Sequence, residues 1–159
     1  MKLSKNYKIV AVSNLVIVVL VILLDQFSKL YLTNAVGLGN TKEFLPGIVQ
    51  IALVQNTGGA FSIFKNFPVV FKIIGLVNVF AFSYVAFCPT VVVNNVIRLG
   101  CGFILGGTIG NLIDRFLKGG VVDFINLQFF DFAIFNVADV CVDIGVLLIF
   151  LGLVLRRGK

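Results

Sequence analysis

The 159-residue sequence contains no histidine, and this absence removes several common kinds of catalysis. Pairs of serine or cysteine with histidine, zinc sites ligated by histidine, and imidazole general bases are all excluded. Charged residues are also scarce, at 13% of the chain. The three cysteines, Cys88, Cys101 and Cys141, lie in or at the ends of apolar segments, so we interpret them as small buried hydrophobic residues.

Hydrophobic residues make up 59% of the chain, and the mean hydropathy is +1.08. A water-soluble domain needs polar outer faces, which long stretches of this chain lack. The composition therefore predicts an integral membrane protein with a single domain over residues 1–159. The net charge is +6, but six of the 13 basic residues lie at the two ends, and the basic residues form no stripe that would indicate nucleic-acid binding.

Four apolar segments are close to the length that a helix needs to cross the hydrocarbon core, about 20 residues. They cover about residues 9–32, 67–88, 96–117 and 137–155. Helices are expected because no backbone polar group can stay unpaired in lipid. The first segment could instead be a cleaved signal peptide, but its apolar run is long for one.

An even number of spans places both termini on one side, and the terminal basic residues predict that this side is cytoplasmic. The long connections, about residues 33–66 and 118–136, would then lie at the outer face. Within the first, residues 48–55 are rich in β-branched side chains and predict a strand. The second is rich in phenylalanine, which indicates segments that rest at the membrane interface rather than free loops.

Acidic residues in or beside the spans are functional candidates, because a charge at the bilayer centre costs about 2.5–3.5 kcal/mol. The predicted topology gathers four of them at the outer end of the bundle: Asp25, Asp114, Asp123 and Asp139. Asp143 lies one turn deeper. Local explanations exist, since Asp139 suits a helix N-terminus, Asp25 can pair with Lys29 and Asp114 adjoins Arg115. They do not explain why the acids converge.

Helical spacing places amides on the same faces as these acids. The two stripes are Gly107, Asn111 and Asp114, and Asn136, Asp139 and Asp143. Beside the first stripe, glycines at 102, 106 and 110 favour the close approach of another helix. Asn56 and Gly58 fall in a tight turn after the predicted strand.

Carboxylates without histidine suit two chemistries. In an aspartyl dyad, two close carboxylates cannot easily both ionise, so one stays protonated as the acid and the other is the base. Alternatively, the same oxygens could bind a cation or serve a transporter. A path through both leaflets would need polar residues that the inner halves of the spans largely lack. A Ser-Lys hydrolase is disfavoured because Ser28 and Lys29 lie about 100° apart on a helix.

Five short motifs along the chain resemble, in the same order, those of a known protein family. Residues 25–29 (DQFSK) resemble D-Q-x-S/T-K, and residues 56–61 (NTGGAF) resemble N-x-G-A-A-F. Residues 106–115 (GGTIGNLIDR) resemble G-G-A-x-G-N-x-x-D-R, and residues 120–124 (GVVDF) resemble G-x-V-x-D-F without a gap. Residues 135–139 (FNVAD) resemble F-N-x-A-D. Together these motifs resemble those of the lipoprotein signal peptidases (signal peptidase II). The departures from that family's pattern are Gly59, Thr108 and Val140.

The resemblance implies an intramembrane aspartyl endopeptidase that removes signal peptides from bacterial prolipoproteins by cleaving before the diacylglyceryl-modified cysteine. Asp123 and Asp139 would be the dyad that activates water, with no cofactor, metal or acyl-enzyme. The residues implied to position the substrate or support the site are Asn56, Gly58, Asn111, Asp114, Arg115, Asn136, Asp25 and Lys29. Among these, Arg115 would hold the outer connection through Asp114, and Asp25 and Lys29 would form a structural pair.

Asp143 could compete with Asp139 as the partner of Asp123, because both lie on one helix face, but the resemblance favours Asp139. The implied fold is an all-α membrane protein whose four transmembrane helices carry a small extracytoplasmic β-sheet cradle. The expected partners are a diacylated prolipoprotein and membrane lipids, without nucleic acid. We expect a monomer in the bacterial cytoplasmic (inner) membrane, with both termini cytoplasmic and the active site near the outer face.

Overall fold

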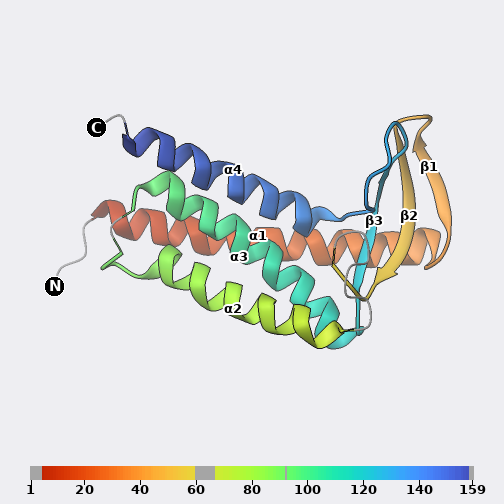
Figure 1. Cartoon of the computed structure of the whole chain (residues 1–159), viewed down its shortest axis with the longest axis horizontal. Helices are drawn as coiled ribbons and strands as arrows, with labels where there is room; N and C mark the ends of the chain where they lie inside the picture. The colour runs from red at the N-terminus through yellow and green to blue at the C-terminus, as the bar shows by residue number, and fades with distance from the viewer. Residues whose placement is uncertain (1–4, 60–66, 92, 158–159) are drawn as a thin grey trace.

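Four helices and a small sheet form the protein in a computed structural model that describes residues 5–59, 67–91 and 93–157 (Figure 1). The helices are α1 (Lys5–Val36), α2 (Pro68–Phe87), α3 (Asn95–Leu117) and α4 (Val137–Arg157). The strands are β1 (Thr41–Leu45), β2 (Val49–Asn56) and β3 (Val121–Leu127). Outside the described residues lie Ala60 and Phe61 of the motif at residues 56–61, and Lys2 and Lys159 among the terminal basic residues.

All four helices are long and apolar enough to cross a membrane, and their bounds agree with the four predicted apolar segments to within a few residues. Helix α3 is central: it packs against each of the other three helices, and 61% of the residues in its apolar stretch are buried. In α1, α2 and α4 the buried share is 22% or less. Their outward leucine, valine and phenylalanine side chains are exposed, as expected for surfaces that face lipid.

Glycines allow two helices to approach α3 closely on different faces. A Cβ atom at Gly102, Gly106 or Gly110 would lie 2.6–2.8 Å from side-chain atoms of α1. On another face, a Cβ atom at Gly107 would lie 2.4 Å from the carbonyl oxygen of Ala138 in α4. The close packing predicted for the repeated glycines is therefore confirmed, and Gly107 extends it to a second neighbour.

The sheet lies at one end of the bundle, and the start of α1 and the end of α4 lie at the other (Figure 1). Strand β2 is central and pairs antiparallel with β1 and β3, so the strand predicted at residues 48–55 is confirmed. The sequence did not predict β1 or β3. Strand β3 is buried because Val122 and Phe124 pack with Leu53 of β2 and with the end of α1, which extends to Val36.

Candidate active site

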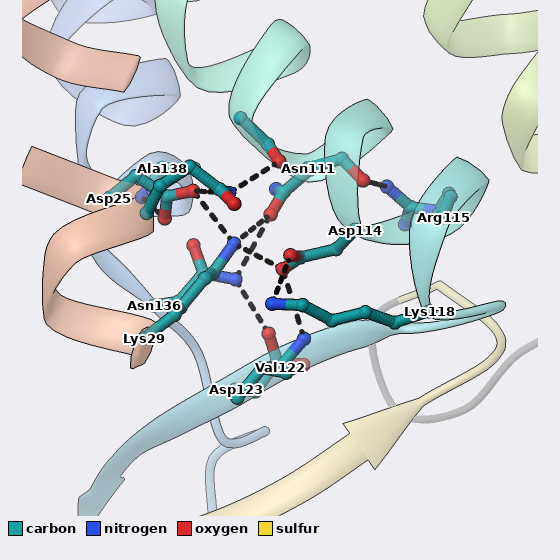
Figure 2. Close-up of polar contacts among 12 residues, drawn as sticks. Asp25, Lys29, Asn111, Asp114, Arg115, Lys118, Val122, Asp123, Asn136 and Ala138 are labelled. Atoms are coloured by element: carbon teal, nitrogen blue, oxygen red, sulfur yellow. Dashed lines mark hydrogen bonds and ion pairs between the residues drawn. The ribbon is translucent and has the colours of Figure 1, made fainter. Parts of the chain in front are cut away.

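Polar residues of α1, α3, α4 and β3 meet where the bundle joins the sheet (Figure 2). Several of these side chains are fully buried, with 0% exposure: Asp25, Lys29, Asp114 and Asn136. Asp123 is 3% exposed. Burying charges at such a depth is unfavourable unless each finds partners, so the contacts among these residues decide whether the arrangement is stable.

Lys29 is the centre of a buried ionic cluster. Its Nζ atom lies 2.8 Å from Asp25 Oδ2 and 2.8 Å from Asp114 Oδ2, and it donates to Asn111 Oδ1 at 3.0 Å. The predicted pair of Asp25 and Lys29 is thus present. Asp114 also binds Lys118, whose Nζ lies 2.8 Å from Asp114 Oδ1. The two carboxylates therefore share one buried ammonium, and a second, partly exposed one completes the cluster.

Among the described residues, no hydrogen bond or ion pair joins Arg115 to Asp114, although the charge of Asp114 acts on Arg115. Its guanidinium lies over the ring of Phe71 in α2, 5.5 Å from the centroid, and donates to the backbone oxygen of Asn111. Consecutive helical residues point about 100° apart, so Asp114 and Arg115 face different neighbours. Asp114 itself holds the outer connection, because its Oδ2 accepts a hydrogen bond from the backbone N–H of Val122 at 3.3 Å.

Two asparagines connect the carboxylates of Asp123 and Asp139. Asn136 Nδ2 donates to Asp123 Oδ1 at 2.6 Å and to Asn111 Oδ1 at 3.1 Å. Asn111 Nδ2 donates to Asp139 Oδ1 at 2.8 Å. A continuous chain of side-chain hydrogen bonds therefore joins the two acids through Asn136 and Asn111.

Asn136 and Asp139 also form a reciprocal cap at the start of α4. The backbone N–H of Asn136 donates to Asp139 Oδ2, and that of Asp139 donates to Asn136 Oδ1, both at 3.0 Å. This is the pattern of a capping box, which satisfies donors that a helix start leaves unpaired. The helix-terminus explanation of Asp139 is therefore correct, and it does not compete with a role in the site, because Asp139 Oδ1 still binds Asn111.

Asn56, at the end of β2, completes the surroundings of Asp123. Its Nδ2 donates to Asp123 Oδ2 at 3.1 Å, while its Oδ1 accepts from the backbone N–H of Gly58 at 3.0 Å in an Asx turn. Burial raises the pKa of Asp123 to about 6, the negative charge of Asp139 adds to this effect, and the hydrogen bonds from Asn56 and Asn136 oppose it. Asp123 therefore keeps its proton to a higher pH than an ordinary aspartic acid.

A pocket of about 440 Å³ opens onto Asp123 and Asp139. Its other polar lining residues are Asn56, Asn111, Arg115 and Asp143. An apolar wall comes from β3 and the segment after it: Val121, Leu127, Phe130, Phe132, Ala133, Ile134 and Phe135. Few polar groups in a mostly apolar concave site are typical of pockets that bind organic ligands. The Asp25–Lys29–Asp114 cluster does not line this pocket.

Sequence reasoning missed several partners of the acids. Lys118 follows Asp114 by four residues, so helical spacing alone could have predicted this ion pair. Gln26, which donates to Asp25 and to the carbonyl oxygen of Gly110, lies within a recognised motif. Backbone donors have no sequence signal: the N–H of Ala138 that binds Asp25 Oδ1 at 3.1 Å could not be identified without the fold.

The fold and the site define a multi-pass membrane protein with a carboxylate-bearing pocket at one end of its helical bundle. The sequence model of the signal peptidase (SPase) II family matches residues 17–155, so the chain belongs to this family. The predicted resemblance and the assignment as a membrane-embedded peptidase are thereby confirmed. Because the chain belongs to this bacterial family and has four helices that are long and apolar enough to span a membrane, it is a multi-pass inner-membrane protein.

Individual relatives agree with this classification. The lipoprotein signal peptidase of Streptococcus pyogenes serotype M2 (strain MGAS10270) is 41% identical over 132 residues, which cover 82% of this chain and 86% of the relative. That of serotype M1 is 40% identical over 136 residues, 85% of this chain and 88% of the relative.

Two solved structures are also similar, each described as a bacterial membrane enzyme determined by the in meso method. The one at 2.3 Å resolution has a TM-score of 0.83 and 32% identity, and covers 91% of this chain and 89% of that chain. The one at 1.9 Å has a TM-score of 0.79 and 33% identity, and covers 89% of this chain and 92% of that chain.

Proposed function

We propose that this protein removes signal peptides from diacylglyceryl-modified bacterial prolipoproteins, cleaving before the lipidated cysteine, with Asp123 and Asp139 as an aspartyl dyad. The observation that carries the proposal is the pair itself. Both carboxylates line one pocket, and a chain of two asparagine amides connects them. The lipoprotein signal peptidases to which the chain is similar supply the class of substrate.

The protonation of the dyad follows from its surroundings. Asp123 is the member that holds the proton, since burial and the charge of Asp139 raise its pKa to about 6. We assign the carboxylate of the dyad to Asp139, which lies in the first turn of α4 and accepts from the backbone N–H of Asn136 and from Asn111 Nδ2. One carboxylic acid and one carboxylate are what general acid–base hydrolysis needs.

The reaction then proceeds through a tetrahedral diol. A water oxygen forms a bond to the scissile carbonyl carbon, while its proton passes to Asp139 and the proton of Asp123 passes to the carbonyl oxygen. As the carbon–nitrogen bond breaks, a diol hydroxyl returns a proton to Asp123, and Asp139 gives its proton to the leaving amine. The dyad ends in its starting state, and the products are a free carboxyl group and the amine of the lipidated cysteine.

The test is turnover of a synthetic diacylated lipobox peptide by the purified protein. Asp123→Asn and Asp139→Asn should each lower kcat by about 10²–10⁴-fold, the usual contribution of a general acid or base. Asp143→Asn is the matched control, one turn from Asp139 on the same helix, and should keep most of the activity. If Asp143→Asn were inactive and Asp139→Asn active, the assignment of the dyad would be overturned.

A cation site is the second candidate for the same carboxylates. Asp25 and Asp114 already bind the ammonium of Lys29, so only the acids that line the pocket would be available to a metal ion. We propose turnover without metal, and activity should therefore survive EDTA. Chelator-sensitive activity that Mg²⁺ or Ca²⁺ restores would instead support the cation site.

A further inference from the structure

Lys29 has as many acceptors as its ammonium has donors. Its side chain is fully buried, and its three N–H groups can reach three oxygens: Asp25 Oδ2 and Asp114 Oδ2, each at 2.8 Å, and Asn111 Oδ1 at 3.0 Å. A neutral amine would have only two donors and would turn its lone pair toward one of these oxygens. The three oxygens match the three donors of an ammonium group, and two of them belong to carboxylates.

The third acceptor belongs to a different kind of group. An amide has an oxygen at one end and an NH₂ group at the other, so the contact of Lys29 with Asn111 Oδ1 fixes which way the amide points. Its Nδ2 then donates to Asp139 Oδ1 at 2.8 Å. A flipped amide would turn its NH₂ toward the ammonium and Asn136 Nδ2, and its oxygen toward Asp139, so all three contacts would become repulsive.

The same oxygen also organises the other acid. Asn111 Oδ1 accepts from Asn136 Nδ2 at 3.1 Å, and this NH₂ group in turn donates to Asp123 Oδ1 at 2.6 Å. Figure 2 shows the contacts of Lys29, Asn111 and Asn136 meeting between the helices, above Asp123. Both acids are thus connected to one ammonium through one amide oxygen.

We propose that Lys29 is a positioning residue for the reaction, which orients the amides of Asn111 and Asn136 and through them the carboxylates of the dyad. This inference rests on the proposed function, because it takes Asp123 and Asp139 as the reacting groups. It goes beyond the structural pair with Asp25 that the sequence predicts. Lys29 does not line the pocket, so its hydrogen bonds reach the dyad only through the amides of Asn111 and Asn136.

The chain offers a matched control in Lys118. Its Nζ lies 2.8 Å from Asp114 Oδ1, as close as Lys29 lies to Asp114 Oδ2, but none of its contacts involves Asn111 or Asn136. Loss of Lys118 therefore removes a cation from the cluster without releasing the amides. The charged groups that surround Lys29 from all packed elements are Asp25, Asp114, Arg115, Lys118, Asp123 and Asp139.

The experiment compares Lys29→Met and Lys118→Met in detergent, measuring kcat and KM for the diacylated peptide across pH together with thermal stability. Lys29→Met should lower kcat by about 10²-fold with little change in KM, since misplacing reacting groups by about 1 Å has this effect. The alkaline limb of its kcat profile should move to higher pH, because the Lys29 charge opposes the burial that raises the pKa of Asp123. Lys118→Met should change neither kcat nor the profile by more than about twofold.

Two further variants keep the test decisive if Lys29→Met folds poorly. Lys29→Met combined with Asp25→Asn removes one buried charge of each sign, so the cluster keeps its net charge and the loss of kcat should persist. In an Asn111→Ala background, Lys29→Met should lower thermal stability as before but should lower kcat little further, because the group through which it acts is already gone.

The outcomes separate the two proposals. If Lys29→Met lost activity only in proportion to unfolded protein, with an unshifted pH profile and additive effects in Asn111→Ala, Lys29 would have a structural role only and the inference would be overturned. The proposed function would still stand in that case if the wild-type protein cleaved the peptide and Asp123→Asn and Asp139→Asn did not. A wild-type protein that failed to cleave the diacylated peptide would overturn both.

Discussion

The substitution Gly107→Ala tests whether the spacing of α3 and α4 sets the geometry of the dyad. A Cβ atom at Gly107 would lie 2.4 Å from the carbonyl oxygen of Ala138, a backbone atom that cannot rotate away. Ala138 adjoins Asp139, and Gly107 lies one helical turn from Asn111. The added methyl group would therefore push apart the two helices that the bond from Asn111 to Asp139 joins.

The size of the effect follows from the contact distance. Ordinary contacts of a Cβ atom begin at 3.4 Å, so relief of a 2.4 Å contact requires about 1 Å of movement, the difference between the two values. Overpacking of this kind costs about 1–3 kcal/mol of stability. A displacement of about 1 Å at reacting groups can lower the rate by about 10²-fold. The bond of 2.8 Å between Asn111 Nδ2 and Asp139 Oδ1 is the contact that would be stretched.

The matched control is Gly145→Ala in the same helix interface. Its Cβ atom would lie 2.6 Å from the carbonyl oxygen of Gly100, a similar clash, but six residues or about 9 Å along α4 from Asp139. Kinetics on the diacylated peptide and thermal unfolding in detergent would be measured for both variants. We expect similar losses of stability but a much larger loss of kcat in Gly107→Ala. Equal losses of kcat, or none in Gly107→Ala, would refute the reasoning.

Two further predictions concern pH and orientation. The pH profile of kcat should be bell-shaped, falling at low pH when both acids are protonated and at high pH when Asp123 loses its proton. Because the pKa of Asp123 is raised to about 6, the alkaline limb should lie at or above this pH, and a limb below about pH 5 would contradict the assignment. A membrane-impermeant maleimide applied to intact cells should label Asn40→Cys, which lies next to the sheet. It should not label the native Cys88, which directly follows α2 and is partly exposed. Labelling of Cys88 from outside would reverse the proposed topology.

Local patterns were sufficient to predict much of the fold. Apolar length identified the four spans, and β-branched residues identified β2, because both signals lie within a single segment. The pair of Asp25 and Lys29 also followed from local spacing, since residues four apart in a helix are neighbours. Strand β3 escaped prediction because Asp123 interrupts its apolar run, and its burial depends on β2 and on the end of α1.

The partners of Asp114 show where local reasoning fails. Three basic residues were available to it: Arg115 next in sequence, Lys118 one turn later and Lys29 on another helix. The structure pairs it with the latter two. The choice depends on the rotation of α3 about its axis, which is set by packing against three other helices, and no pattern within α3 contains this information.

The two buried layers of the site have different electrostatic tasks. A salt bridge as deeply buried as that of Lys29 and Asp25 contributes little net stability compared with apolar residues of similar size, so its value lies in fixing orientation. If the ammonium touched Asp123 directly, it would strongly favour the ionised carboxylate and remove the proton donor. The amides of Asn111 and Asn136 lie between the two groups, and they fix the orientation of the carboxylate although they carry no charge. Burial can therefore still raise the pKa of Asp123 to about 6 while the position of its carboxylate remains fixed.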